Sequence, residues 1–168
     1  MNMAEIIKVF RDPVPAMRFI GKKYADYGGW GEWFANGWFD TVERAMGGAD
    51  KILAVWKNGG GYCGLERRGE GIFDYWIGMF TPAGTPVPEG FVYVDFPAGD
   101  FGTAWIRGPE EEVHGAIPAC AEKLREAGME FRTDEDGAVW SFENGLCPRF
   151  TTPDEEGCVI LDYCYPVK

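Results

Sequence analysis

The sequence predicts an α+β fold in which one β-α-β-β unit is duplicated in tandem. Strand-like and helix-like segments follow one another in the same order in both halves of the chain, and a stretch rich in Pro and Gly, 81–90, separates them. Its prolines cannot continue a strand ladder. With 168 residues, 46% of them hydrophobic, the chain has the size and composition of one globular domain. We expect a single domain over 1–168, with pseudo-repeats at about 1–80 and 90–168.

The first half contains strand patterns on both sides of one helical pattern. Aromatic and aliphatic residues recur at steps of three and four over 30–46, which places them on one helical face, and Gly47-Gly48 supplies a stop. A short polar and Gly-containing turn at 68–71 joins two apolar segments and indicates a hairpin. The expected elements are an entry strand (6–9, continuing through 17–24 after Pro13 and Pro15), a helix (30–46) and a hairpin (62–67 and 72–80).

The second half repeats this order. The expected elements are strands at 91–96 and 101–107, a helix at about 110–127, and strands at 138–143 and 158–167. Pro118 would disrupt an established helix, so the helix either begins near Gly115 or bends at the proline. Gly128 is placed to end it.

Composition excludes several classes of function. The net charge of −11 argues against direct contact with nucleic acid, which requires clustered Lys and Arg. No apolar run approaches the roughly 20 residues that a membrane helix needs, and the first residues do not have the pattern of a signal peptide. The five Cys include no CxxC pair, so we expect reduced thiols and a cytoplasmic protein. Aromatic residues make up 15% of the chain, which favours a ring-lined pocket in addition to a core.

Motifs for common catalytic or cofactor chemistry are scarce. His114, the single histidine, lies in an acidic stretch without an evident Ser or Cys partner, and we interpret it as a surface or helix-start residue. Cys158 and Cys164 would be roughly 20 Å apart on an extended strand, too far to share a zinc ion. The glycines form no phosphate-binding motif. We therefore expect neither a metal nor a cofactor.

Glu143 is the strongest candidate for ligand recognition. It ends an apolar segment, 138–143, and strand alternation places Trp140 and Phe142 on one face with Ser141 and Glu143 on the other. A carboxylate flanked by rings attracts a cation through its charge and through the ring quadrupoles. The alternative is a strand-end Glu that points into solvent.

The chain resembles the gyrase-inhibitor-like, or effector-binding, domains. Short segments along nearly the whole chain carry the resemblance, and they occur in the family's order: Met17–Tyr24, Phe73–Gly78, Val87–Phe91, Phe96–Gly99, Phe142-Glu143 and Pro166–Lys168. The resemblance implies a curved antiparallel sheet with two helices, and a central ligand groove between the pseudo-symmetric halves. It also implies a glutamate that meets cationic drugs among aromatic rings, which Glu143 matches.

The resemblance also implies the other residues of the groove. Tyr75 resembles a pocket aromatic of the first half, and Tyr163 and Tyr165 resemble aromatics of the last strand, of which either could face inward. Glu66 occupies the place in the first half that Glu143 has in the second. The expected ligand-binding residues are Glu143, Tyr75, Tyr163, Tyr165, Trp38, Trp105 and Glu66.

The sequence leaves the function open between a binding module and an enzyme. As a binding module, the chain senses or sequesters a hydrophobic small molecule, aromatic or cationic. As an enzyme, it hydrolyses cyclopropane-bearing electrophiles with Glu143 acting on water, as some free-standing members of the family do. A third alternative is inhibition of a protein target such as gyrase through the acidic surface. Regulators of the family carry a helix-turn-helix segment ahead of this domain, and we expect none here because the resemblance begins near residue 10.

Overall fold

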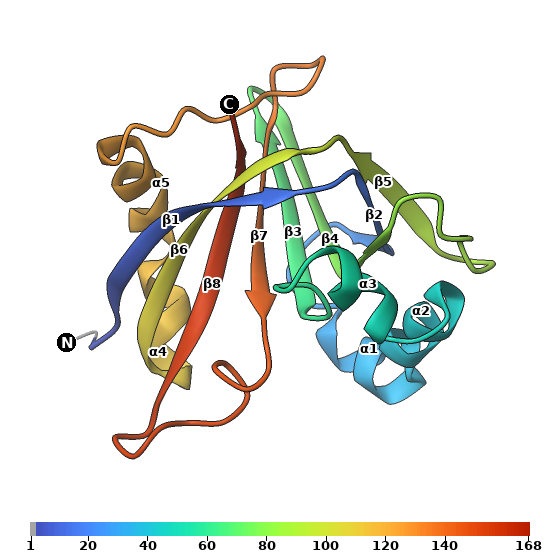
Figure 1. Ribbon diagram of the computed structural model, residues 1–168, viewed down its shortest axis with the longest axis horizontal. Helices are drawn as coiled ribbons and strands as arrows, with labels where there is room; N and C mark the ends of the chain where they lie inside the picture. The colour runs from blue at the N-terminus through green and yellow to red at the C-terminus, as the bar shows by residue number, and fades with distance from the viewer. Residues whose placement is uncertain (1–2) are drawn as a thin grey trace.

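The computed structural model describes residues 3–168 and contains one eight-stranded antiparallel sheet with helices at its two ends (Figure 1). The strands are β1 (Glu5–Val14), β2 (Met17–Tyr24), β3 (Tyr62–Gly69), β4 (Ile72–Pro82), β5 (Val92–Phe96), β6 (Gly99–Pro109), β7 (Val139–Gly145) and β8 (Cys158–Val167). The helices are α1 (Trp30–Asn36), α2 (Trp38–Met46), α3 (Asp50–Val55), α4 (Glu110–Val113) and α5 (Ile117–Glu126), with a 3₁₀ turn at His114–Ala116. The predicted α+β class is confirmed.

The strand order is symmetric about the contact between β3 and β7. The order is β1-β6-β8-β7-β3-β4-β2-β5. Each strand of the first half has a counterpart in the second half (β1 and β5, β2 and β6, β3 and β7, β4 and β8), and exchanging the counterparts gives the same order read backwards. This is the pattern expected of two equivalent units joined edge to edge. The centre of the order therefore lies between β3 and β7, and not at the stretch 81–90 that separates the two halves in the sequence. That segment lies at the periphery, where it joins β4 to the edge strand β5.

Each half contributes its first strand to the edge of the other half. β1 pairs with β6 of the second half, and β5 pairs with β2 of the first half. The predicted entry strand, with its break at Pro13 and Pro15, is therefore two separate strands, which meet at Pro15-Ala16. The equivalent connection between β5 and β6 is Pro97-Ala98. The register is equivalent too, since Val14 faces Gly99 and Phe96 faces Met17. Pro13 is tolerated within β1 because β1 is an edge strand.

The two predicted helices are each divided into shorter segments. Gly37 adopts a left-handed conformation (φ 64°), which ends α1 and redirects the chain into α2. In the second half, Pro118 lies in the first turn of α5, where its missing N–H leaves no intrahelical bond unmade. The sequence allowed either a helix that starts near Gly115 or a helix that bends at Pro118. The structure shows the first alternative, since α5 starts at Ile117.

Other local predictions are confirmed with small changes at their boundaries. β3 and β4 form a hairpin whose two-residue connection ends at Gly71, which has φ 70°. β4 continues to Pro82, so Thr81 still pairs with Arg18 and the ladder extends two residues into the predicted linker. The cysteines Cys63, Cys120, Cys147, Cys158 and Cys164 are all free thiols.

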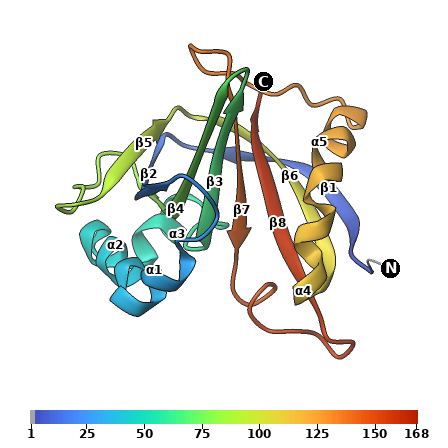
Figure 2. The same cartoon turned by 180° about the vertical axis from the view of Figure 1, so that it is seen from behind.

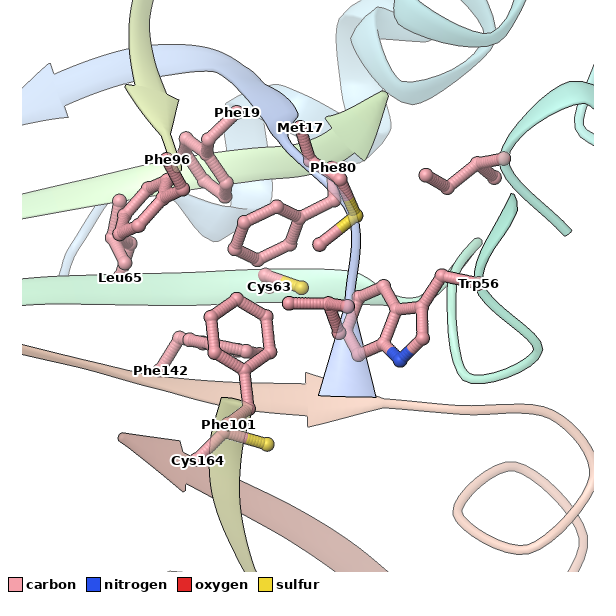
Figure 3. Packing of buried hydrophobic residues seen from close by; sticks show 12 residues of the cluster. Met17, Phe19, Trp56, Cys63, Leu65, Phe80, Phe96, Phe101, Phe142 and Cys164 are labelled. Atoms are coloured by element: carbon pink, nitrogen blue, oxygen red, sulfur yellow. The ribbon is translucent and has the colours of Figure 1, made fainter. Parts of the chain in front are cut away.

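A cluster of buried rings joins the two halves (Figure 3). Phe80 of β4 lies 5.7 Å from Phe101 of β6 and 4.8 Å from Phe142 of β7, measured between ring centroids. Trp56, which follows α3, packs edge-on against Phe80 at 5.6 Å. Tilted and edge-to-face rings at these distances add attraction beyond the burial of their area. The core is therefore shared between the halves, and it holds the strands that carry the candidate site.

We predict that Phe80→Ala destabilises the protein by about 3 to 5 kcal/mol, because it removes a fully buried ring from the centre of the shared core. Tyr93→Ala on the edge strand β5 is the matched control, since that ring is 50% exposed and its loss should cost less than about 1 kcal/mol. Urea unfolding followed by circular dichroism measures both. Equal losses for the two variants would contradict a core shared around Phe80.

Candidate functional site

A cavity of about 970 Å³ lies on the face of the sheet opposite Phe142, between the two helical groups. Figure 2 shows α1 and α2 at one end and α4 and α5 at the other, with β7 and β8 between them. Side chains of β3, β7 and β8 form the floor of the cavity. One wall contains Trp30 of α1, and the opposing wall contains three residues of α5: Ile117, Pro118 and Ala121. Both halves therefore contribute to it, and its size falls within the usual range of small-molecule sites.

Glu143 lies on the floor of this cavity. It faces Gly64 across the β3–β7 pair and Tyr163 across the β7–β8 pair, and directly opposed residues project from the same face of a sheet. Gly64 leaves the space that the carboxylate needs, since a Cβ at that position would lie 2.7 Å from Glu143 Oε1 and would overlap the Tyr75 hydroxyl. The Glu143 side chain is 17% exposed, so it points into the cavity and not into open solvent.

His114 is the ionic partner of Glu143. Its Nε2 lies 2.8 Å from Glu143 Oε2, and the half-exposed imidazole belongs to the first residue of the 3₁₀ turn between α4 and α5. The hydrogen bond to Glu143 raises the pKa of His114 above its usual value, against the opposing effect of burial, and the charge of Glu110 adds to the rise. The interpretation of His114 as a surface or helix-start residue matches its half-exposed side chain, and the helix that it starts is the short 3₁₀ turn after α4. Its pairing with Glu143 was missed because the two residues are far apart in the sequence.

Three tyrosines predicted for the groove line the cavity. Tyr75 accepts a hydrogen bond from Trp30 Nε1 at 2.8 Å, and the Tyr163 hydroxyl lies 2.9 Å from Ser141 Oγ. Tyr165 stacks on Phe131 with a centroid distance of 4.3 Å. Tyr163 and Tyr165 both face the cavity because they lie two residues apart on β8, so the alternatives between them are not exclusive.

Burial keeps these phenols protonated. It raises the pKa of Tyr165 to about 12 and raises the pKa of Tyr75 above its usual range as well, with the charge of Glu143 adding to the effect on Tyr75. The hydroxyl groups are therefore neutral near pH 7. They can donate hydrogen bonds without adding negative charge to the cavity.

Glu66 also lines the cavity, but its charge is compensated. Arg68 Nε donates a hydrogen bond to Glu66 Oε2 at 2.7 Å, and the Tyr27 hydroxyl donates to Glu66 Oε1 at 2.8 Å. An arginine stays protonated at all ordinary pH values. Glu143, in contrast, is paired with a histidine, which can lose its charge. The two cavity carboxylates therefore differ in their availability to a cation.

Trp105 and Trp38 lie outside this cavity, so the structure does not bring them together with the other residues predicted for the ligand site. Trp105 pairs with Asp162 across β6 and β8 and donates a hydrogen bond to it, so it shares the face of Asp162 and not that of Tyr163. Trp38 begins α2 after the break at Gly37 and packs against Phe91 and Trp33.

Several cavity residues were not predicted. Trp30 belongs to the regular apolar face that predicts the first helix, and that pattern carries no sign of the break at Gly37 that gives α1 its own direction. Tyr27 and Arg68 come from connections and from the end of β3. Both residues bond to Glu66, which is 39 residues from Tyr27 and 2 residues from Arg68 in the sequence. The pair with Arg68 is local and could be recognised from the sequence, whereas the pair with Tyr27 depends on the fold.

Residues 3–168 show neither a metal-binding cluster nor a membrane-spanning helix. That part of the chain contains no group of three or more His, Cys, Asp or Glu side chains arranged to hold a metal ion. None of its helices has the length and apolar character needed to cross a bilayer.

Comparisons with known proteins identify the fold. The sequence matches no family model and no curated protein. Among solved structures, the chain is similar to the putative bacterial transcription regulation protein from Staphylococcus aureus MU50, with 14% identity, a TM-score of 0.61, and coverage of 96% of this chain and 99% of that chain. The chain has the fold of the effector-binding domains. At this identity the similarity concerns the fold alone.

Two further structures share this fold and differ in their described functions. SAV2435, solved bound to tetraphenylphosphonium, has 15% identity and a TM-score of 0.57, with 96% of this chain and 94% of that chain covered. A hydrolase encoded by lin2189 from Listeria innocua has 13% identity and a TM-score of 0.53, with 96% of this chain and 92% of that chain covered. The same fold therefore occurs in a protein solved with a bound organic cation and in a protein described as a hydrolase, so the fold by itself does not assign a function.

We predict that the His114–Glu143 pair stabilises the protein more at pH 5.5 than at pH 9.0. Because the folded pKa of His114 lies above its unfolded value of about 6.5, this stabilisation is fully present below that unfolded pKa and is lost as the pH rises through the folded pKa. The half-exposed imidazole limits the contribution to about 1 kcal/mol or less.

Thermal unfolding of the wild type and of His114→Gln at both pH values measures this effect. The difference in Tm between the two proteins should be larger at pH 5.5. A difference that is equal at both pH values, or larger at pH 9.0, would show that the charged pair does not form.

Proposed function

We propose that the chain binds a hydrophobic, cationic aromatic small molecule in the cavity between its halves, and that it senses or sequesters this molecule in the cytoplasm. The observation that carries the proposal is Glu143, a largely buried carboxylate that lies beside Tyr75 and Tyr163 and has a histidine, not an arginine, as its partner. A cation that displaces the half-exposed imidazole gains the full charge of Glu143 and the faces of the surrounding rings.

Charge on the whole chain supports a cationic ligand. The net charge of −11 raises the local concentration of cations around the protein. The neutral tyrosine hydroxyls and the compensated Glu66–Arg68 pair leave Glu143 as the carboxylate that selects for charge within this cavity. A common fold with SAV2435, which was solved with tetraphenylphosphonium, makes that cation a suitable first probe.

We predict that Glu143→Gln weakens the binding of tetraphenylphosphonium by about 1 to 3 kcal/mol, because the substitution removes the charge and keeps nearly the same shape. Binding of neutral triphenylphosphine oxide should hardly change. Isothermal titration calorimetry measures both affinities. Glu122→Gln is the matched control, since Glu122 lies exposed on α5 outside the cavity and its loss changes the net charge equally.

The two probes separate a specific site from a general effect of charge. A similar loss of tetraphenylphosphonium affinity in Glu143→Gln and Glu122→Gln would assign the attraction to the overall field of the protein. A similar loss for the neutral and the charged probe in Glu143→Gln would indicate a damaged cavity. Either result would contradict recognition of a cation by Glu143.

The second candidate is hydrolysis of a cyclopropane-bearing electrophile, which the contact between Glu143 and His114 favours. A carboxylate and an imidazole 2.8 Å apart can take the proton of an attacking water while the strained carbon–carbon bond breaks and the released carbon is protonated. The similarity in fold to a hydrolase from Listeria innocua is consistent with this reading.

The hydrolase alternative predicts a different result for the same variant. Glu143→Gln should abolish turnover of a cyclopropane substrate and leave its binding largely intact, because a general base acts in the transition state. Product formation followed by chromatography, together with calorimetry of the unreacted substrate, measures the two quantities. Absence of turnover in the wild type would leave binding as the function of the cavity.

A further inference from the structure

A second cavity of about 490 Å³ adjoins the first. Both cavities are lined by Trp30, His114 and Glu143, so these residues form a common wall. The remaining lining of the second cavity is mainly apolar and includes Phe34, Tyr62, Phe150 and Leu161. It thus continues the candidate site past the His114–Glu143 pair and into a space bounded by rings from both halves.

The rings of the second cavity are held in place, but one of them is poorly covered. Tyr62 stacks on Phe39 with a centroid distance of 3.8 Å and an interplanar angle of 4°. Phe34 lies 6.0 Å from Tyr62 and 6.4 Å from Trp30, yet it is 61% exposed. A large exposed ring beside a cavity is a feature of ligand sites more than of plain surface. An apolar group bound there would remove Phe34 from water.

Charge is concentrated at the wall between the cavities. Glu143 and His114 face both spaces, and Glu110 lines the second cavity close enough to influence His114. The rings of Tyr75, Tyr163 and Tyr165 lie on one side of this charged wall, and those of Phe34, Tyr62 and Phe150 lie on the other. A ligand that satisfies this arrangement carries its charge in the middle and hydrophobic groups on both sides.

We propose that the second cavity is an aromatic subsite of the same binding site, and that the ligand class is a cation flanked by two hydrophobic arms, one on each side of the His114–Glu143 pair. This inference rests on the proposed binding of a cation at Glu143. The first cavity holds one arm beside the tyrosines, the positive centre replaces the imidazolium at Glu143, and the second arm covers Phe34.

A matched pair of small cations tests the proposal. Benzyltrimethylammonium has one ring attached to its charged nitrogen, and dibenzyldimethylammonium has two rings on opposite sides of the same kind of nitrogen. The two-armed cation should bind the wild type roughly tenfold more tightly, because the second ring is buried in the subsite. Isothermal titration calorimetry with the full chain gives both dissociation constants.

Two variants locate the second arm. Phe34→Ala should weaken the two-armed cation by roughly three- to tenfold and should change the one-armed cation by less than twofold. Thr151→Trp, at an exposed position that lines only the second of these two cavities, should fill the subsite and reduce the two-armed cation to the affinity of the one-armed cation. Tyr93→Ala removes a comparably exposed ring on β5, outside both cavities, and should affect neither cation.

The outcomes distinguish this inference from the proposed function. If both cations bind, both lose affinity in Glu143→Gln, and Phe34→Ala and Thr151→Trp leave the advantage of the two-armed cation unchanged, the second arm lies elsewhere and only the subsite is refuted. Equal binding of the two cations to the wild type refutes the subsite in the same way. If neither cation binds, recognition of cations at Glu143 and the subsite both fail.

Discussion

The contact between Phe80, Phe101 and Phe142 is the interaction on which the other features of the fold depend. These rings come from both halves, and each half also places its first strand at the edge of the other. A half by itself would lose its edge partner and leave its rings exposed. The shared core therefore makes the two halves one cooperative unit, and it fixes the contact between β3 and β7 at the centre of the sheet.

The geometry of the cavity follows from that central contact. β3 brings Gly64 opposite Glu143, and the missing side chain creates the space that Glu143 and the Tyr75 hydroxyl occupy. Phe142, the preceding residue of β7, faces the ring cluster instead. Successive residues of β7 thus belong to the core and to the site. The rigid packing of Phe142 in the core limits the movement of Glu143 in the cavity. This is an effective support for a recognition site, since a preformed cavity loses little freedom when it binds.

Sequence patterns predicted the floor of the site better than its walls. The alternation around Glu143 placed the carboxylate on the face opposite Phe142, because a strand has a period of two residues whatever its partners are. The same period puts Tyr163 and Tyr165 on one face of β8, but the sequence prediction treated them as alternatives. Trp105 was misplaced, since its face is set by the register of β6 against β8. His114 was missed as a partner of Glu143 because an ion pair between distant residues leaves no periodic signal.

The sequence by itself determined the α+β class, the repeated order of elements, the hairpin of β3 and β4, and the acidic character of the chain, because these depend on composition, on local periodicity and on turn residues. Only the tertiary structure decided that β1 and β5 exchange places, that Gly37 divides the first helical pattern, and that His114 meets Glu143 at a wall between two cavities. Those features depend on which distant segments pack together, and the free energy of that packing is shared among many side chains and is not encoded in any one of them.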